Sequence, residues 1–441
     1  MQNKTISRQR PHERGQTMVL VAISLVSLLA MAALAIDIVT LYAARSEIQR
    51  AADAAAIAGA KALADSGITT LLLTDANFNT IKTWADTAKN QQIDAVLSNN
   101  LVAGQPPSVV SKTVDWSRQG NPHLTVSLQR TGLPTFFSKI WTRSAATVTA
   151  TATAEVYNPA NLTSITPIAP KNVKPWLVAN VDPTGTAPTF VDTTLWGVDS
   201  GVIGKNFNLV SDCNSLNSTS CSPLFAPPAA WSPAPNQVYY VPAAVNTPST
   251  PNVCPACAGG TDYEQSIECA DVATSYQVLS CGGGAANAQW NNTINPGAPP
   301  AGNNATSLGG QCLIHASNQG LGQNQDLINN PGIWPAAAVQ FKAQSGPQNG
   351  NLVTTSNSIV TIPIFDTGTF NPAVNPVTIV GFLQAFINQL DAPPIVSGPP
   401  AGSINITVLN IAGCSSTNNG ANPVVGASGS SPVPVRLITP P

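Results

Sequence analysis

Charged side chains are scarce in this sequence. Of its 441 residues only 9% are Asp, Glu, Lys or Arg, and the formal net charge is −2, whereas an average soluble domain is about 25% charged. This composition argues against an ordinary cytosolic enzyme, and the small supply of Lys and Arg argues against nucleic-acid binding. The hydrophobic fraction of 43% is nevertheless sufficient for one or two cores.

Sequence patterns of catalysis are scarce as well. The three histidines are His12, His123 and His315, and no Gly-x-Ser-x-Gly motif is present. A Ser-His-Asp hydrolase is therefore not supported. We predict no catalytic residue, no cofactor and no bound metal, and we expect the protein not to be an enzyme.

Cysteines are confined to the second part of the chain. Residues 1–158 contain 14 basic and 10 acidic groups but no cysteine, whereas residues 159–441 contain 5 basic and 11 acidic groups and all eight cysteines. The cysteines are Cys213, Cys221, Cys254, Cys257, Cys269, Cys281, Cys312 and Cys414. An even number in a polar, loop-rich region indicates disulfides in an oxidising compartment. We expect Cys213 to pair locally with Cys221, and a Cys312–Cys414 bond would close a long loop.

The motif Cys254-Pro-Ala-Cys257 has three interpretations. A zinc site needs a second cysteine pair or a nearby histidine, and the remaining spacings do not supply a second such pair. A thioredoxin-like site needs a strand before the motif and a helix after it, whereas Pro251 and Gly259-Gly260 flank it with loop. Structural disulfides are favoured, and the redox and metal sites stay open as alternatives.

A cluster of acidic residues is the densest charge in the second part of the chain. It consists of Asp262, Glu264, Glu268 and Asp271. Carboxylates are the hard oxygen ligands that calcium prefers. A solvated helix face explains the same residues, and no Asp-x-Asp-x-Asp-Gly loop is present. The sequence leaves calcium binding open.

The strongest physical signal is an uncharged apolar run from Met18 to Ile36. Its 19 residues include only Ser24 and Ser27 as polar interruptions, and about 20 residues span the hydrocarbon of a bilayer. Lys4, Arg8, Arg10 and Arg14 precede the run. This basic tail predicts a cytoplasmic N-terminus and an extracytoplasmic chain from Asp37 onward. The alternative is a signal peptide cleaved after Ala35.

The helical pattern continues beyond Asp37 to about Ala64, and Ser66-Gly67 ends it. Small and apolar residues recur along one seam of this segment, which permits close approach of another helix. The predicted helix-packing residues are Leu41, Ile48, Ala51, Ala55, Ala58, Gly59 and Ala62. A simple juxtamembrane stalk is the alternative.

These N-terminal residues resemble a known family. The sequence is similar to the N-terminal module of TadG-like proteins of the Flp (tight adherence, Tad) pilus-assembly family. The similar residues are Glu13-Arg14-Gly15-Gln16, the apolar run, Asp37, Tyr42, Arg45, Ile48-Gln49 and AADAAAIAGA (Ala51 to Ala60). The resemblance implies a bacterial envelope protein that assembles or anchors an adhesive pilus without catalysis.

The chain departs from the patterns of this family and its relatives in two ways. Leu20 stands where pilins and their processed relatives carry a Glu, five residues after the cleavage-site Gly, so we expect the basic tail to be retained. Many TadG-like proteins also carry a von Willebrand A domain, whose metal site needs an Asp-x-Ser-x-Ser motif. This motif is absent from the sequence.

The remainder of the chain predicts an α+β fold. We expect helices within residues 68–104, a hairpin over 109–129, a short helix at 134–141 and a strand at 147–156. A loop-rich insertion follows at 161–303. After it we expect strands at 356–365 and 403–413, a last short strand near the C-terminus, and a helix at 377–390.

The predicted organisation is a cytoplasmic basic tail (1–16), a transmembrane and pilin-like helix (17–66), a small α+β module (67–159) and a β-rich, disulfide-stabilised ectodomain (160–441). The predicted function is a single-pass inner-membrane protein that assembles or anchors an Flp/Tad-type pilus. Its predicted partners are the lipid bilayer and other pilus-assembly or pilin-like helices. The alternatives are a surface adhesin or matrix-binding module with the same anchor, and a thiol oxidoreductase at Cys254 and Cys257.

Overall fold

The computed structural model describes most of the N-terminal third of the chain and the regular elements of the rest. The described residues are 13–118, 120–133, 145–158, 168–170, 172–194, 197–211, 231–243, 254–255, 257, 261–269, 305–315, 325–328, 343–350, 356–370, 377–390, 403–413, 424–425 and 431–438. They divide into two compact units. One unit comprises Met1–Ala55, Asp94–Lys112 and Thr125–Ala152, and the other comprises Ala56–Ile93, Thr113–Leu124 and Thr153–Pro441.

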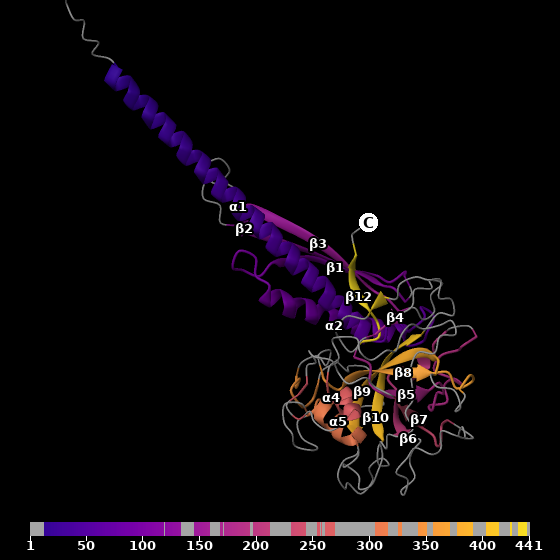
Figure 1. The fold of residues 1–441 in the computed structure, drawn as a ribbon. Coiled ribbons are helices and arrows are strands. Elements are labelled where there is room, and N and C mark those ends of the chain that lie inside the picture. Colours follow the sequence, from indigo (N-terminus) through magenta and orange to yellow (C-terminus); the bar gives the residue numbers. More distant parts are fainter. Residues whose placement is uncertain are drawn as a thin grey trace, which may run out of the picture. The chain divides into compact units, whose positions relative to one another are not determined.

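The first element is one uninterrupted helix, α1 (Glu13–Asp65), followed by α2 (Phe78–Asn99) (Figure 1). The helix ends where the sequence predicts it to end, because Gly67 adopts the left-handed conformation with φ 75°. A Cβ at Gly67 would also lie 2.5 Å from the carbonyl oxygen of Leu409. Glycine is therefore required at this position by both backbone conformation and space.

A four-stranded sheet follows in the order β1-β2-β3-β12. Strands β1 (Ser108–Asp115), β2 (His123–Leu133) and β3 (Ala146–Val156) confirm the predicted hairpin and strand. The C-terminal strand β12 (Val435–Ile438) pairs antiparallel with β3 and completes the sheet. The predicted helix at 134–141 lies outside the described residues.

The second sheet is a closed barrel in the order β10-β6-β7-β5-β8-β9 (Figure 1). Its strands are β5 (Trp176–Ala179), β6 (Asn206–Ser211), β7 (Gln237–Pro242), β8 (Ile359–Phe365), β9 (Ile379–Leu390) and β10 (Ile404–Gly413). Every residue of β5 and β8 is buried, which explains why β5 is a continuous apolar run and why Thr361 is the one polar residue of β8. The pairs β5/β8 and β6/β7 are parallel, and the other barrel pairs are antiparallel.

The prediction of a helix at 377–390 is wrong, because this segment forms β9. Apolar residues there, such as Phe382 and Phe386, recur at helical spacing. However, residues 379–388 are all buried, including the polar Gln384 and Asn388, so the strand has no solvent-exposed face whose alternation would distinguish it from a helix. Pairing with β8 on one side and β10 on the other determines the extended conformation.

The remaining elements are short. They are β4 (Ile168–Ala169), which pairs with β11 (Val424–Val425), the 3-10 helix η1 (Ser200–Val202), and the helices α4 (Asp262–Glu268) and α5 (Ala305–Ile314). A long N-terminal apolar helix followed by a strand-rich body with few helices confirms the predicted α+β class.

Candidate functional site

The N-terminal part of α1 is apolar and exposed on all sides. Large side chains from Met18 onward, including Leu28 at 67% and Met31 at 66%, are accessible. Water-soluble surfaces rarely present a continuous apolar area of this kind. The helix is long and apolar enough to cross a membrane.

Burial begins on one face of α1 near the end of this apolar run. Ala33, Asp37, Ala44 and Ile48 are all buried within the chain. Their spacings of four, seven and four residues place them along the same side of the helix. One side of α1 is therefore covered within the chain from Ala33 onward.

The predicted helix-packing residues are largely covered by the chain itself. Ile48, Ala51, Ala55, Gly59 and Ala62 are buried, whereas Leu41 and Ala58 are half-buried. A Cβ at Gly59 would lie 2.6 Å from Leu124 Cδ2 and 2.9 Å from Ile93 Cδ1. The small residues thus allow α2 and β2 to approach α1 closely. Packing against a second protein's helix stays a prediction.

The C-terminal end of α1 is bonded to the last barrel strands. Asn410 Nδ2 donates to the carbonyl oxygen of Ala64 at 2.6 Å, and Gln384 Nε2 donates to Asp65 Oδ1 at 2.8 Å. Just beyond the helix, Thr70 Oγ1 donates to the carbonyl oxygen of Ile411 at 3.0 Å. A helix leaves its last carbonyl groups without internal donors, and Asn410 supplies one.

Two disulfides join segments distant in sequence. Cys254 is bonded to Cys269, and Cys257 to Cys312, with Cα–Cα distances of 4.2 and 5.7 Å. The expected oxidation is thus confirmed for these four cysteines. Cys213, Cys221, Cys281 and Cys414 lie outside the described residues.

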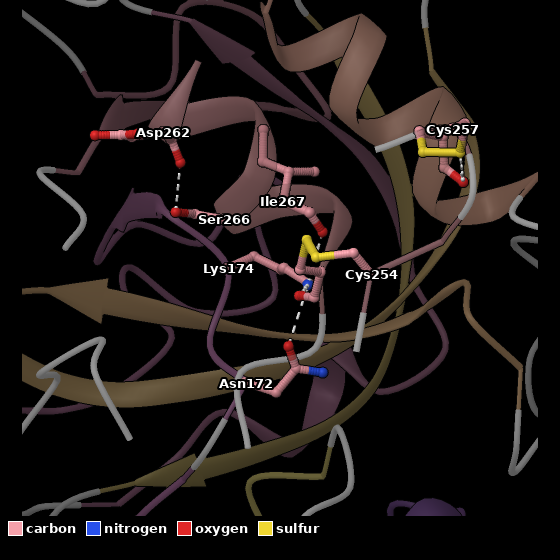
Figure 2. Close-up of a disulfide and its surroundings, with 9 residues drawn as sticks. Asn172, Lys174, Cys254, Cys257, Asp262, Ser266 and Ile267 are labelled. Atoms are coloured by element: carbon pink, nitrogen blue, oxygen red, sulfur yellow. Dashed lines mark hydrogen bonds between the residues drawn. A yellow bond between two sulfur atoms is a disulfide. The ribbon is translucent and has the colours of Figure 1, made fainter. Parts of the chain in front are cut away.

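The pairing corrects two interpretations of the sequence. The expected Cys312–Cys414 bond is wrong, because α5 places Cys312 beside Cys257. The two cysteines of the Cys254-Pro-Ala-Cys257 motif are bonded to different partners rather than to each other (Figure 2). The motif therefore connects two helices, α4 through Cys269 at its C-terminal end and α5 through Cys312.

A buried lysine lies beside the first disulfide. Lys174 is 1% exposed, and its Nζ donates to the carbonyl oxygens of Ile267 at 2.7 Å and Cys269 at 3.2 Å (Figure 2). Asn172 Oδ1 accepts a further bond at 3.2 Å. The ammonium group thus binds the negative end of α4. Sequence reasoning missed Lys174, although a lysine two residues before the apolar run at Trp176, in a part of the chain with few basic residues, was a usable signal.

The acidic cluster has a structural role in α4. Glu264 accepts from the Thr261 backbone N–H at 2.7 Å, and Thr261 Oγ1 accepts from the Glu264 N–H, so the two form a capping box. Glu264 and Glu268 are buried, so the solvated-face interpretation is wrong for them. Asp271 lies outside the described residues. Across the described ranges, no group of three metal-ligating side chains is present.

The two histidines in the described part of the chain have different surroundings. His315 is buried at the end of α5, its Nδ1 lies 3.0 Å from the carbonyl oxygen of Gln311, and burial lowers its pKa. His123 Nε2 lies 3.5 Å from Glu155 Oε2, and burial lowers the pKa of His123 as well. His12 lies outside the described residues.

Comparison with known proteins gives a match for α1. No curated protein and no solved structure matches the chain. Residues 15–62, which include the exposed apolar section and the small-residue section of α1, match the model of the putative Flp pilus-assembly TadE/G-like family.

Proposed function

We propose that this protein is a single-pass inner-membrane component of Flp/Tad pilus assembly. The proposal rests on two findings for the same segment. Residues 15–62 match the family model, and they contain the exposed apolar section of α1. The family suggests a non-catalytic role, in which the protein anchors or guides the pilus through helix packing and ectodomain contacts.

The proposed orientation has a cytoplasmic N-terminus and a periplasmic or extracellular body. The basic residues Arg8, Arg10 and Arg14 precede the apolar run, in accord with retention of positive charge in the cytoplasm. The disulfides of the body support an oxidising location, since cytosolic thiols are kept reduced.

The exposed side of α1 is the part of the outer helix that a partner can reach. Ile57 is 42% exposed, and Gln49 and Arg50 are also exposed. Ala55, by contrast, is 0% exposed. We therefore place the partner helix on the side of Gln49, Arg50 and Ile57, with half-buried Ala58 at its margin.

Deletion and complementation of the gene test the function. We expect surface pili to be lost on deletion and restored by the full chain. A chain whose residues 1–36 are replaced by a cleavable signal peptide should not restore them. Normal piliation after deletion, with loss of adhesion alone, would instead support the adhesin alternative.

Photocrosslinking in cells tests the partner surface. A photoreactive residue at Ile57 should form adducts with another pilus-assembly helix. The same residue at Ala55 is the matched control, because it lies on the covered face only two residues away. Equal adducts from both positions would contradict the assigned side.

A further inference from the structure

Burial around Asp37 is the reverse of what the sequence pattern suggests. Asp37, the first charged residue after the apolar run, is only 3% exposed. The apolar and aromatic residues that follow it are accessible, with Ile38 at 50%, Val39 at 67% and Tyr42 at 76%. The exposed surface of α1 therefore stays apolar beyond the point at which the sequence places the first charge.

These three side chains are neighbours on the exposed side of the helix. Residues separated by four positions lie one turn apart, so Tyr42 follows Ile38 on the same face and Val39 adjoins both. The protein shelters the Asp37 side chain, which keeps this carboxyl group out of contact with lipid. Tyrosine has an apolar ring and a polar tip, which favours the boundary between lipid and water.

A positively charged side chain follows Tyr42, at the level where the phosphate groups of the lipid would lie. Arg45 is exposed and lies three residues beyond Tyr42, which corresponds to about 4.5 Å along the helix axis. Arginine can extend its apolar stem along lipid and place its guanidinium among phosphates. From Ile38 to Arg45 the surface thus changes from apolar to aromatic to cationic, in the order of a lipid leaflet from acyl chain to phosphate.

The length of the segment agrees with this arrangement. Thr17 to Tyr42 comprises 26 residues, which corresponds to about 39 Å of helix. The hydrocarbon core of a bilayer is about 30 Å thick, and about 40–45 Å with both headgroup regions. The apolar run therefore fills the core, and the following residues reach into one headgroup region.

We propose that Ile38, Val39, Tyr42 and Arg45 form a lipid-binding band in the headgroup region of the outer leaflet, with Arg45 pairing with phospholipid phosphate. The band holds the base of the protein body at the membrane surface. This inference rests on the proposed function in two respects, namely that α1 crosses the bilayer and that its N-terminus is cytoplasmic.

Crosslinking to lipid tests the band. The full chain is reconstituted in vesicles of phosphatidylethanolamine and phosphatidylglycerol, with photoreactive benzoylphenylalanine at Leu28, Tyr42 or Gln49. We expect comparable lipid adducts at positions 28 and 42, and background levels at the exposed position 49. Adducts at 28 without adducts at 42, or protein adducts in place of lipid at 42, would overturn the band and leave the anchor intact. Absence of lipid adducts at 28 would overturn the anchor itself.

A second measurement tests the role of Arg45. In vesicles of phosphatidylcholine and phosphatidylglycerol, adducts at position 42 should be enriched in phosphatidylglycerol over its share of the lipid. The Arg45→Gln variant should lose this enrichment, whereas the Arg50→Gln control should keep it. An unchanged ratio in Arg45→Gln would overturn the pairing with phosphate.

Discussion

Asn410 in β10 donates its side-chain amide to the carbonyl oxygen of Ala64 in the last turn of α1, although the two residues are 346 positions apart. The neighbouring bond from Gln384 in β9 to Asp65 has a similar separation of 319. The end of the N-terminal helix is thus completed by strands formed near the C-terminus.

Asn410→Leu should destabilise the fold. The substitution leaves the buried carbonyl oxygen of Ala64 without this donor, at a cost of about 1–3 kcal/mol. Urea unfolding of the detergent-solubilised full chain measures the change. Asn90→Leu, at an exposed position of α2, is the control and should leave the midpoint unchanged. Equal midpoints for the two variants would contradict the assigned bond.

Gly59→Leu should destabilise the protein even in the absence of a partner. The new side chain would collide with Leu124 and Ile93, whose atoms lie within 3 Å of a Cβ at this position. Overpacking of this kind costs about 1–3 kcal/mol. Thermal unfolding monitored by circular dichroism measures the effect. The Ala43→Leu substitution, at an exposed position, serves as control. An unchanged unfolding temperature for Gly59→Leu would show that Leu124 and Ile93 move aside at little cost.

Non-reducing peptide mapping should recover peptides that link Cys254 to Cys269 and Cys257 to Cys312. In the chain-entropy model, loops of 15 and 55 residues correspond to about 3 and 4 kcal/mol of stabilisation. Removing the second bond with paired serine substitutions should therefore cost slightly more than removing the first. Recovery of a Cys254–Cys257 peptide from native envelopes would contradict this pairing and revive the redox interpretation.

Lys174→Met should destabilise the packing of α4. Methionine keeps the apolar stem but removes the ammonium group that binds the carbonyl oxygens of Ile267 and Cys269. We expect the free energy of unfolding to fall by about 1.5–3 kcal/mol, which is the range for hydrogen bonds to charged groups. The exposed Lys205→Met is the control. Because Cys269 is also held by its disulfide, Lys174→Met should combine non-additively with the Cys254→Ser/Cys269→Ser pair. If the two losses of stability simply add, Lys174 and the disulfide do not stabilise the same end of α4.

Acidification should destabilise the protein through His315. Burial lowers the pKa of His315 below its ordinary 6.5 in the folded state, so the unfolded chain binds the proton more readily. The contribution of the neutral imidazole is present above pH 6.5 and is lost as pH falls through the lower folded pKa. His315→Gln should flatten the dependence of unfolding free energy on pH in that range. Both proteins should carry His123→Gln, since the pKa of His123 is lowered as well. Identical slopes would contradict the prediction.

Features set by local composition could be predicted from the sequence. The apolar run predicts a membrane helix because about 20 uncharged residues suffice to cross hydrocarbon. Gly67 predicts the end of α1 because glycine tolerates a positive φ. The alternation of threonine with small apolar residues predicts β3, because side chains of a strand point to opposite faces in turn.

Only the tertiary structure decided which distant segments meet. A strand buried on both faces has no polar periodicity, so β9 became distinguishable from a helix only through its pairing with β8 and β10. Spacing along the chain does not determine disulfide partners, and the packing of α5 brought Cys312 to Cys257. The small residues around Gly59 predict a close approach but not the neighbour that makes it, because any helix or strand of suitable shape fits against them. In this protein the chain's own Ile93 and Leu124 occupy that place.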